Sequence, residues 1–183
     1  LSDILVFGKR AGDAAALFAK ENPGLPAIDD GMIQTERDLL IGPFESGGKE
    51  NPYMLHEALQ EVMGHHAGIA RTHEGLTEGL ENLESLKERA CRLHVEGSRL
   101  YNPGWHSARD DLFMLTICEA VFRCAIERKE SRGAHWRTDY EGKNSDYGTI
   151  NYVAKKVDGA MQVSARPIPP MPAELAQLLE ETA

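Results

Sequence analysis

The sequence predicts a mainly α fold with a short β element near its end. We expect an N-terminal buried helix, then a three-helix bundle of the spectrin-like, up-down-up type, and finally a short C-terminal β-hairpin with an extended proline-rich tail. Three observations favour this fold. Apolar residues recur with a helical period between positions 51 and 129, β-branched residues flank a turn dipeptide at position 158, and prolines crowd positions 166–172.

The composition supports a folded domain and argues against several functional classes. Hydrophobic residues make up 42% and charged residues 27% of the 183 residues, which is typical of a globular domain. The formal net charge of −9 argues against nucleic-acid binding, which uses clustered basic residues. No run approaches the ~20 apolar residues that a membrane span requires, and no signal peptide is recognisable, so we expect a cytoplasmic location.

Residues 2–21 have the pattern of an interior helix. Their charged residues fall in one narrow sector, and small residues occupy a separate face. Ser2 or Asp3 can cap the first turn and leave backbone N–H groups for an electron-rich ligand atom. Two interpretations stay open: an ordinary core helix, or a helix whose small face lets a backbone or a flat cofactor approach. The small residues are Gly8, Gly12, Ala15, Ala16 and Ala19.

The next stretch is expected to be a connector. Asn22-Pro23-Gly24-Leu25-Pro26 ends the first helix, and residues 44–49 are flexible by composition, so residues 22–50 should hold one helical turn at most. Asn51-Pro52 then has the pattern of a helix start, with asparagine as the cap and proline at the first helical position.

Two further helices complete the predicted bundle. Leucines and one alanine form an apolar stripe along residues 76–93. Residues 104–129 are apolar around most of the helix circumference, so this helix should be the central one, with Glu119 and Arg123 paired at i,i+4 spacing. Residues 150–157 and 160–164 then flank Asp158-Gly159 as a hairpin, and residues 173–181 form a last short helix.

Histidines and cysteines provide few chemical candidates. His65 and His66 are adjacent and point about 100° apart on a helix, so no metal site is expected. Cys118 and Cys124 lie in the most apolar helix, where burial suppresses thiol reactivity, so they should be packing residues. Together with Cys91 they are odd in number and lack Cys-x-x-Cys spacing, which argues against disulfides and a closed zinc site.

Arg132, His135 and Arg137 are the strongest candidates for a role beyond packing. They follow the long helix on both sides of Gly133, which can adopt a positive φ and so cap the helix end. Three cationic or titratable side chains extend from one turn, an arrangement suited to holding a carboxylate or carbonyl cluster across an interface. A structural interface role and direct ligand contact both stay open, and the pattern favours the interface role.

Two parts of the chain resemble one protein family. The segment Leu1-Ser2-Asp3-Ile4-Leu5-Val6-Phe7-Gly8-Lys9-Arg10-Ala11-Gly12 resembles the one that follows the last flavin-contacting turn in flavoprotein subunits of succinate dehydrogenase and fumarate reductase. The helical C-terminal domain of that family is similar, in the same order, to Tyr101-Asn102-Pro103-Gly104-Trp105, Glu119-Ala120 and Arg128-Lys129-Glu130-Ser131-Arg132-Gly133-Ala134-His135. The resemblance covers nearly the whole chain and is weakest in residues 22–49 and after Asp139.

The resemblance implies a division of the chain. Residues 1–21 match the last helix of an FAD-binding domain, residues 22–50 a linker, residues 51–139 a helical-bundle C-terminal domain, and residues 140–183 the hairpin and tail. Leu1 and Ser2 match residues that approach the flavin ring. The family's dinucleotide fingerprint and its substrate-binding and proton-transfer residues precede this region, so we expect no catalytic residue here and no FAD bound to this chain alone.

By the same resemblance, the intact protein is an FAD-dependent oxidoreductase that interconverts succinate and fumarate and passes electrons to an iron–sulfur subunit. Its expected partners are the upstream FAD-binding and capping domains and that subunit, with membrane contact only through partner subunits at the cytoplasmic face. Two alternatives stay open: a helical docking module without enzymatic activity, and the C-terminal part of an L-aspartate oxidase. After Asp139-Tyr140 the chain lacks the family's proline, which leaves the route of this loop open.

Overall fold

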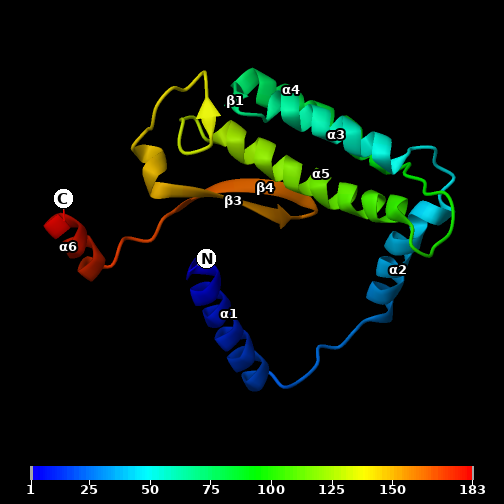
Figure 1. The fold of residues 1–183 in the computed structure, drawn as a ribbon, viewed down its shortest axis with the longest axis horizontal. Helices are drawn as coiled ribbons and strands as arrows, with labels where there is room; N and C mark the ends of the chain where they lie inside the picture. Colours follow the sequence, from blue (N-terminus) through cyan, green and yellow to red (C-terminus); the bar gives the residue numbers. More distant parts are fainter. Residues whose placement is uncertain (1, 183) are drawn as a thin grey trace. The chain divides into compact units, whose positions relative to one another are not determined.

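The computed structural model describes the backbone of residues 2–182 and the side chains of residues 2–175, 177 and 178. The chain divides into two compact units, Leu1–Leu39 and Leu40–Ala183, which are considered separately. Helices dominate both units and a short antiparallel strand pair lies near the C-terminus, so the mainly α prediction is confirmed (Figure 1). Among the described helices, none combines the length and apolarity needed to cross a membrane.

Helix α1 spans Ser2–Glu21, as predicted, but none of its residues is buried. Ile4, Phe7 and Phe18 are 73%, 59% and 68% exposed. A helical period is a property of local sequence, whereas burial requires a second surface. Within its own unit, the described residues up to Leu39 do not bury the helix, so the expected burial is not provided there.

Helix α2 spans Asp30–Glu45, where a connector with one helical turn at most was expected. Asp29 precedes it and accepts a hydrogen bond from the Gly31 N–H at 2.9 Å. The internal Pro43 made the helix hard to recognise, because proline removes a helical hydrogen bond. Pro43 is buried, and its carbonyl accepts the Val95 N–H at 2.8 Å, which joins this end of the helix to the segment after α4.

The segment after α2, which was expected to be flexible, is hydrogen-bonded to residues 92–94, which follow α4. The Glu50 N–H donates to the Arg92 carbonyl at 3.1 Å, and the His94 N–H donates to the Glu50 carbonyl at 2.9 Å. Gly48 lies so close to Arg92 that an added Cβ would collide with the Arg92 carbonyl group. Glycine at this position therefore permits close backbone approach rather than flexibility.

The predicted three-helix bundle is present as α3 (Pro52–His66), α4 (His73–Ala90) and α5 (Pro103–Glu127), which lie side by side (Figure 1). Each helix begins at a side-chain cap. Asn51, Thr72 and Asn102 accept the N–H groups of Tyr53, Gly75 and Trp105 at 2.9, 3.0 and 3.2 Å. The core between the helices consists mainly of leucines, with Val95, Phe122 and several alanines.

Each pair of helices in the bundle is also joined by a polar contact. Such contacts favour one helix register, because a shift along the axis would leave a buried polar group without its partner. The three contacts are His56–Asp111 between α3 and α5 at 2.9 Å, Lys87–Glu119 between α4 and α5 at 2.6 Å, and His66–Asn82 between α3 and α4 at 3.2 Å. The predicted Glu119–Arg123 pair is also present, at 2.6 Å.

The β structure is partly as expected. The predicted hairpin is present as β3 (Ile150–Val157) and β4 (Ala160–Pro167), with Val157 opposite Ala160 and positive φ values of 49° and 82° at Asp158 and Gly159. It packs along α5 (Figure 1). The chain ends in the expected short helix, α6 (Ala173–Thr182). The parallel pair of β1 (Ala70–Arg71) and β2 (Trp136–Arg137) was not predicted, since two residues have no detectable period.

Gly79 and Gly64 offer a matched test of core packing. A Cβ at Gly79 would overlap the Phe122 ring and approach the His66 Cβ to 2.6 Å, whereas a Cβ at Gly64 would meet nothing within 4 Å. Gly79→Ala should therefore cost about 1–3 kcal/mol of unfolding free energy by overpacking. Gly64→Ala should raise it by about 0.5–1 kcal/mol through helix propensity. Urea denaturation measures both, and equal effects of the two substitutions would contradict this packing.

Candidate functional site

The segment after α5 forms a tight turn rather than a helix cap. α5 ends at Glu127, and the predicted positive φ occurs at Gly133, at 59°. The Arg132 N–H donates to the His135 carbonyl at 2.8 Å, and the His135 N–H returns to the Arg132 carbonyl at 3.0 Å. Gly133 thus serves a two-residue turn several positions beyond the helix end, instead of capping α5.

Arg137 lies in the interior and does not extend toward a partner. Its side chain is 0% exposed, and its Nε and Nη2 atoms each donate to the Asp139 carboxylate at 2.7 Å. Its Nη1 donates to the Ala125 carbonyl at 2.8 Å. This carbonyl is one of the acceptors that the end of α5 leaves without a helical partner. Arg137 therefore satisfies the end of α5 from inside the fold.

Asp139 connects this arginine to the next helix of the bundle. Its Oδ2 accepts the His73 N–H at 2.7 Å, at the start of α4. The hydrogen bonds from Arg137, followed by that from His73, lower the pKa of the Asp139 carboxyl to about 2. One ion pair, in which only the arginine is buried, thus holds the end of α5 against the beginning of α4.

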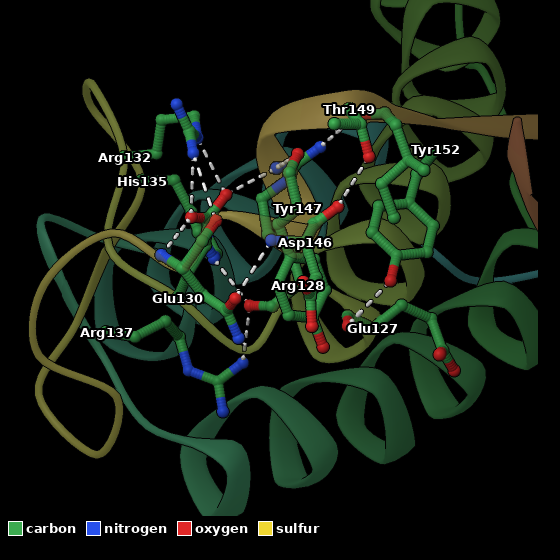
Figure 2. A network of polar contacts seen from close by, with 12 residues as sticks. Glu127, Arg128, Glu130, Arg132, His135, Arg137, Asp146, Tyr147, Thr149 and Tyr152 are labelled. Carbon is green, nitrogen blue, oxygen red and sulfur yellow. Dashed lines mark hydrogen bonds and ion pairs between the residues drawn. The ribbon is translucent and has the colours of Figure 1, made fainter. Parts of the chain in front are cut away.

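Glu130 is the centre of a second group of charges, shown in Figure 2. It is 1% exposed and accepts hydrogen bonds from Arg128 Nη1 at 2.6 Å, Arg132 Nε at 2.8 Å and the Asn144 N–H at 2.9 Å. The Arg132 hydrogen bond is the main reason that the pKa of Glu130 falls to about 2. Two arginines and a backbone amide therefore keep this buried carboxylate ionised.

Arg128 joins this group to the hairpin. Its guanidinium donates to the Tyr147 and Ile150 carbonyls, each at 3.2 Å, and lies 5.9 and 5.4 Å from the ring centroids of Tyr147 and Tyr152. The Tyr152 hydroxyl donates to the Glu127 carbonyl at 3.0 Å (Figure 2). The beginning of β3 is thereby attached to the end of α5.

His135 is held as a neutral ring between cationic groups. Its Nε2 lies 3.0 Å from the Arg128 carbonyl, which can only accept, so the proton is on Nε2. Its Nδ1 then accepts from Arg71 Nη1 at 3.2 Å. Burial, and next the nearby charges of Arg71 and Arg137, lower the pKa of His135.

The three predicted residues do meet at one turn, but their partners belong to this chain. Arg137 is fully buried, His135 is engaged on both ring nitrogens, and Arg132 faces Glu130 and the Asn144 carbonyl. Among the described residues, all three side chains therefore bind groups of this chain, and Arg137 is not available to a partner. Sequence reasoning missed the carboxylates Glu130 and Asp139, although acids flanked by arginines were a visible signal.

The sequence also suggested a role for the start of the first helix and a packing role for two cysteines. Ser2 begins α1 and is exposed, while Leu1 lies outside the described residues. Cys118 and Cys124 are half-buried free thiols, and burial raises the pKa of both. In the part of the chain that the structure describes, no three His, Cys, Asp or Glu side chains lie together in a way that could hold a metal ion.

Glu130→Gln tests the charge cluster. The amide keeps the size of the side chain but removes the charge that Arg128 and Arg132 share, so at pH 7 it should cost about 1.5–3 kcal/mol of unfolding free energy. The cost should shrink as pH falls from 4.5 toward about 2, because Glu130 itself then becomes neutral. Urea denaturation at several pH values measures it. Glu127→Gln, on an exposed neighbour, is the control, and equal losses in both variants would contradict this role.

The neutral His135 ring should make the fold sensitive to acid. Its folded-state pKa lies below its unfolded value of about 6.5, so the stability that it contributes is present above that pH and is lost as pH falls. His135→Gln, which cannot take up the proton, should flatten the decline in urea midpoint between about pH 7 and pH 5. His65→Gln, at an exposed position, is the control. Parallel declines in the wild type and His135→Gln would rule out a neutral His135.

Comparisons with known proteins identify the family to which the chain is similar. The family model described as "Fumarate reductase flavoprotein C-term" matches residues 56–177. The fumarate reductase flavoprotein subunit of Mycobacterium tuberculosis is 29% identical over 176 residues, covering 92% of this chain and 30% of that protein. The Proteus vulgaris subunit is 31% identical over 141 residues, covering 76% and 24%. The chain thus spans less than a third of the length of these relatives.

Solved structures agree with this comparison. The structure of Mycobacterium smegmatis Sdh1 in complex with UQ1 superposes with a TM-score of 0.90 at 35% identity, covering 99% of this chain and 31% of the other. Adenylylsulfate reductase from Archaeoglobus fulgidus, at 22% identity and a TM-score of 0.75, shares the fold alone. Since the family model covers more than half of the residues, the chain belongs to the family of succinate dehydrogenase and fumarate reductase flavoprotein subunits.

Proposed function

We propose that the intact protein is the flavoprotein subunit of a succinate dehydrogenase or fumarate reductase and that this chain supplies its C-terminal part. FAD in that enzyme exchanges hydride with the dicarboxylate and passes electrons to an iron–sulfur subunit. The chain itself provides no catalytic residue. The names of the relatives support this function, and they do not favour an L-aspartate oxidase or an independent docking module.

The observation that carries the proposal is the uncovered apolar surface of α1. Ile4, Phe7 and Phe18 are all more than half exposed, together with other large apolar side chains of this helix. Apolar patches of this kind mark interaction surfaces in soluble proteins. We assign this surface to contact with an upstream FAD-binding domain, to which α1 contributes the last helix.

The same helix fits one edge of the flavin. An added Cβ at Gly8 or Gly12 would meet nothing within 4 Å, so this face admits a close neighbour. Ser2, at the start of the helix, and Leu1, which precedes it in the sequence, would hold the ring edge through their backbone groups. The chain contains no Gly-x-Gly-x-x-Gly motif, so the groups that bind the FAD phosphates belong to the upstream domain.

The arginine cluster then has an internal role in this part of the subunit. Arg137 and His135 hold the ends of α4 and α5 together, as their partners in this chain indicate. Arg132 keeps a partly exposed side chain, and we assign its outer edge to the contact with the FAD-binding or capping domain. The subunit would reach the cytoplasmic face of the membrane only through its partner subunits.

This proposal predicts that the isolated chain folds but neither retains flavin nor reduces fumarate, because the phosphate-binding and proton-transfer groups are elsewhere. The measurement is visible flavin absorbance after gel filtration, for the isolated chain and for the product of the whole reading frame that encodes it. The longer protein should retain flavin and reduce fumarate. Flavin retained by the isolated chain, or a longer protein that binds none, would overturn the proposal.

A further inference from the structure

A buried carboxylate without full compensation lies between α3 and α5. Asp111 is on the core-facing side of α5 and is 0% exposed. Its Oδ1 lies 2.9 Å from His56 Nδ1 on α3, but its Oδ2, also buried, has no hydrogen-bond partner among the described residues. Glu119, on the same helix, is compensated by both Lys87 and Arg123. Asp111 has only a histidine, whose charge depends on pH.

The hydrogen bonds of His56 indicate which of its ring nitrogens carries the proton. Its side chain is 35% exposed, and its Nε2 lies 3.0 Å from the Gln60 side-chain nitrogen. An amide nitrogen donates, so in this arrangement Nε2 accepts and the ring proton is on Nδ1, directed at Asp111. Rotation of the Gln60 amide by half a turn would present its oxygen to an Nε2–H, so the protonated ring can also be satisfied.

Among the described residues, no charged group other than His56 is recorded as offsetting the negative charge of Asp111. The charges that act on the Asp111 carboxyl are those of His56, on α3, and Asp110, its neighbour on α5, which increases the negative charge. His106 and Asp110 line the same cleft of about 460 Å³ as His56. From α4, the third helix of the bundle, no charged side chain is recorded against Asp111 among the described residues. When His56 is neutral, an ionised Asp111 is therefore a buried net negative charge with one donor.

We propose that the His56–Asp111 pair is a proton-binding switch that tightens the contact between α3 and α5 when the pH falls. In the protonated state the pair has no net charge, either as a His56–Asp111 ion pair or as a neutral Asp111 beside a neutral His56. The hydrogen bond between His56 on α3 and Asp111 on α5 is kept in both forms. In the deprotonated state the interface holds an uncompensated charge, which low-polarity surroundings penalise.

The direction of the pH effect follows from burial. Burial raises the pKa of Asp111, so the folded chain holds a proton that the unfolded chain releases. The stabilisation is complete below the unfolded value of about 3.9 and is lost as pH rises through the folded value. Glu130, Asp139 and His135 act in the opposite direction, since their pKa values are lowered. The pH dependence that Asp111 contributes is therefore measured as the difference in stability between the wild type and a variant that lacks this carboxyl group.

The test compares urea unfolding midpoints of the full chain and Asp111→Asn between about pH 4 and pH 8. The substituted amide would accept the same hydrogen bond from His56 without a charge. The midpoint of Asp111→Asn, relative to the wild type, should rise as pH rises. Asp110→Asn removes a charge from the exposed neighbour and should run nearly parallel to the wild type. A constant difference between Asp111→Asn and the wild type at every pH would overturn the proposal.

A second measurement decides the case even if Asp111→Asn does not fold. Nitrogen-15 NMR of the His56 ring in the wild-type chain reports which nitrogen carries the proton. At high pH the proton should be on Nδ1, and the signals of α3 and α5 should stay those of the folded state as the pair takes up its proton on acidification. A ring protonated only on Nε2 at high pH, or loss of the folded signals as the pair takes up its proton, would refute the switch.

Discussion

The unpaired carbonyls at the end of α5 are the constraint on which this fold depends. The last turn of a helix leaves acceptors without partners, and α5 has no glycine cap to satisfy them. Arg137, Tyr152 and His135 supply the missing donors to Ala125, Glu127 and Arg128. Because these side chains come from later in the sequence, satisfying one helix end also positions the turn, β2 and the hairpin.

Arg137 has the largest share in this arrangement, because its buried guanidinium binds Asp139 and the carbonyls of Ala125 and Arg128. Two of its guanidinium nitrogens donate to the Asp139 carboxylate, and that carboxylate also accepts the first N–H of α4. The same ion pair therefore connects α5 to α4. A lysine could not reproduce this planar, bidentate geometry. The cluster for which the sequence favoured an interface role over ligand contact thus connects α4, α5 and the β elements within this chain.

The two ends of the bundle respond to acid in opposite ways. Glu130, Asp139 and His135 are arranged for neutral pH, because arginines lower the pKa of the two acids, and burial, followed by nearby arginines, lowers the pKa of the ring. Between α3 and α5, Asp111 lacks such a cation, so burial favours its protonated form. The distinction follows from the number of donors that each carboxylate receives rather than from the depth of burial alone. α1, by contrast, carries an exposed ion pair between Lys9 and Asp13 and an exposed apolar face, which we assign to contact with a partner surface.

The sequence by itself determined the features that depend on neighbouring residues. The period of the leucines predicted α4, Asn51-Pro52 predicted the start of α3, and Asp158-Gly159 predicted the hairpin, since each signal acts within a few residues. The basic residues after α5 also predicted a charged turn. Only the tertiary structure decided that α2 continues through Pro43, that β1 pairs with β2, and that Arg137 is buried. In the first two cases the partner lies far away in the sequence, so the stabilising contact has no local pattern from which to predict it. Arg137 binds the nearby Asp139, but its burial depends on the carbonyl of Ala125 at the end of α5.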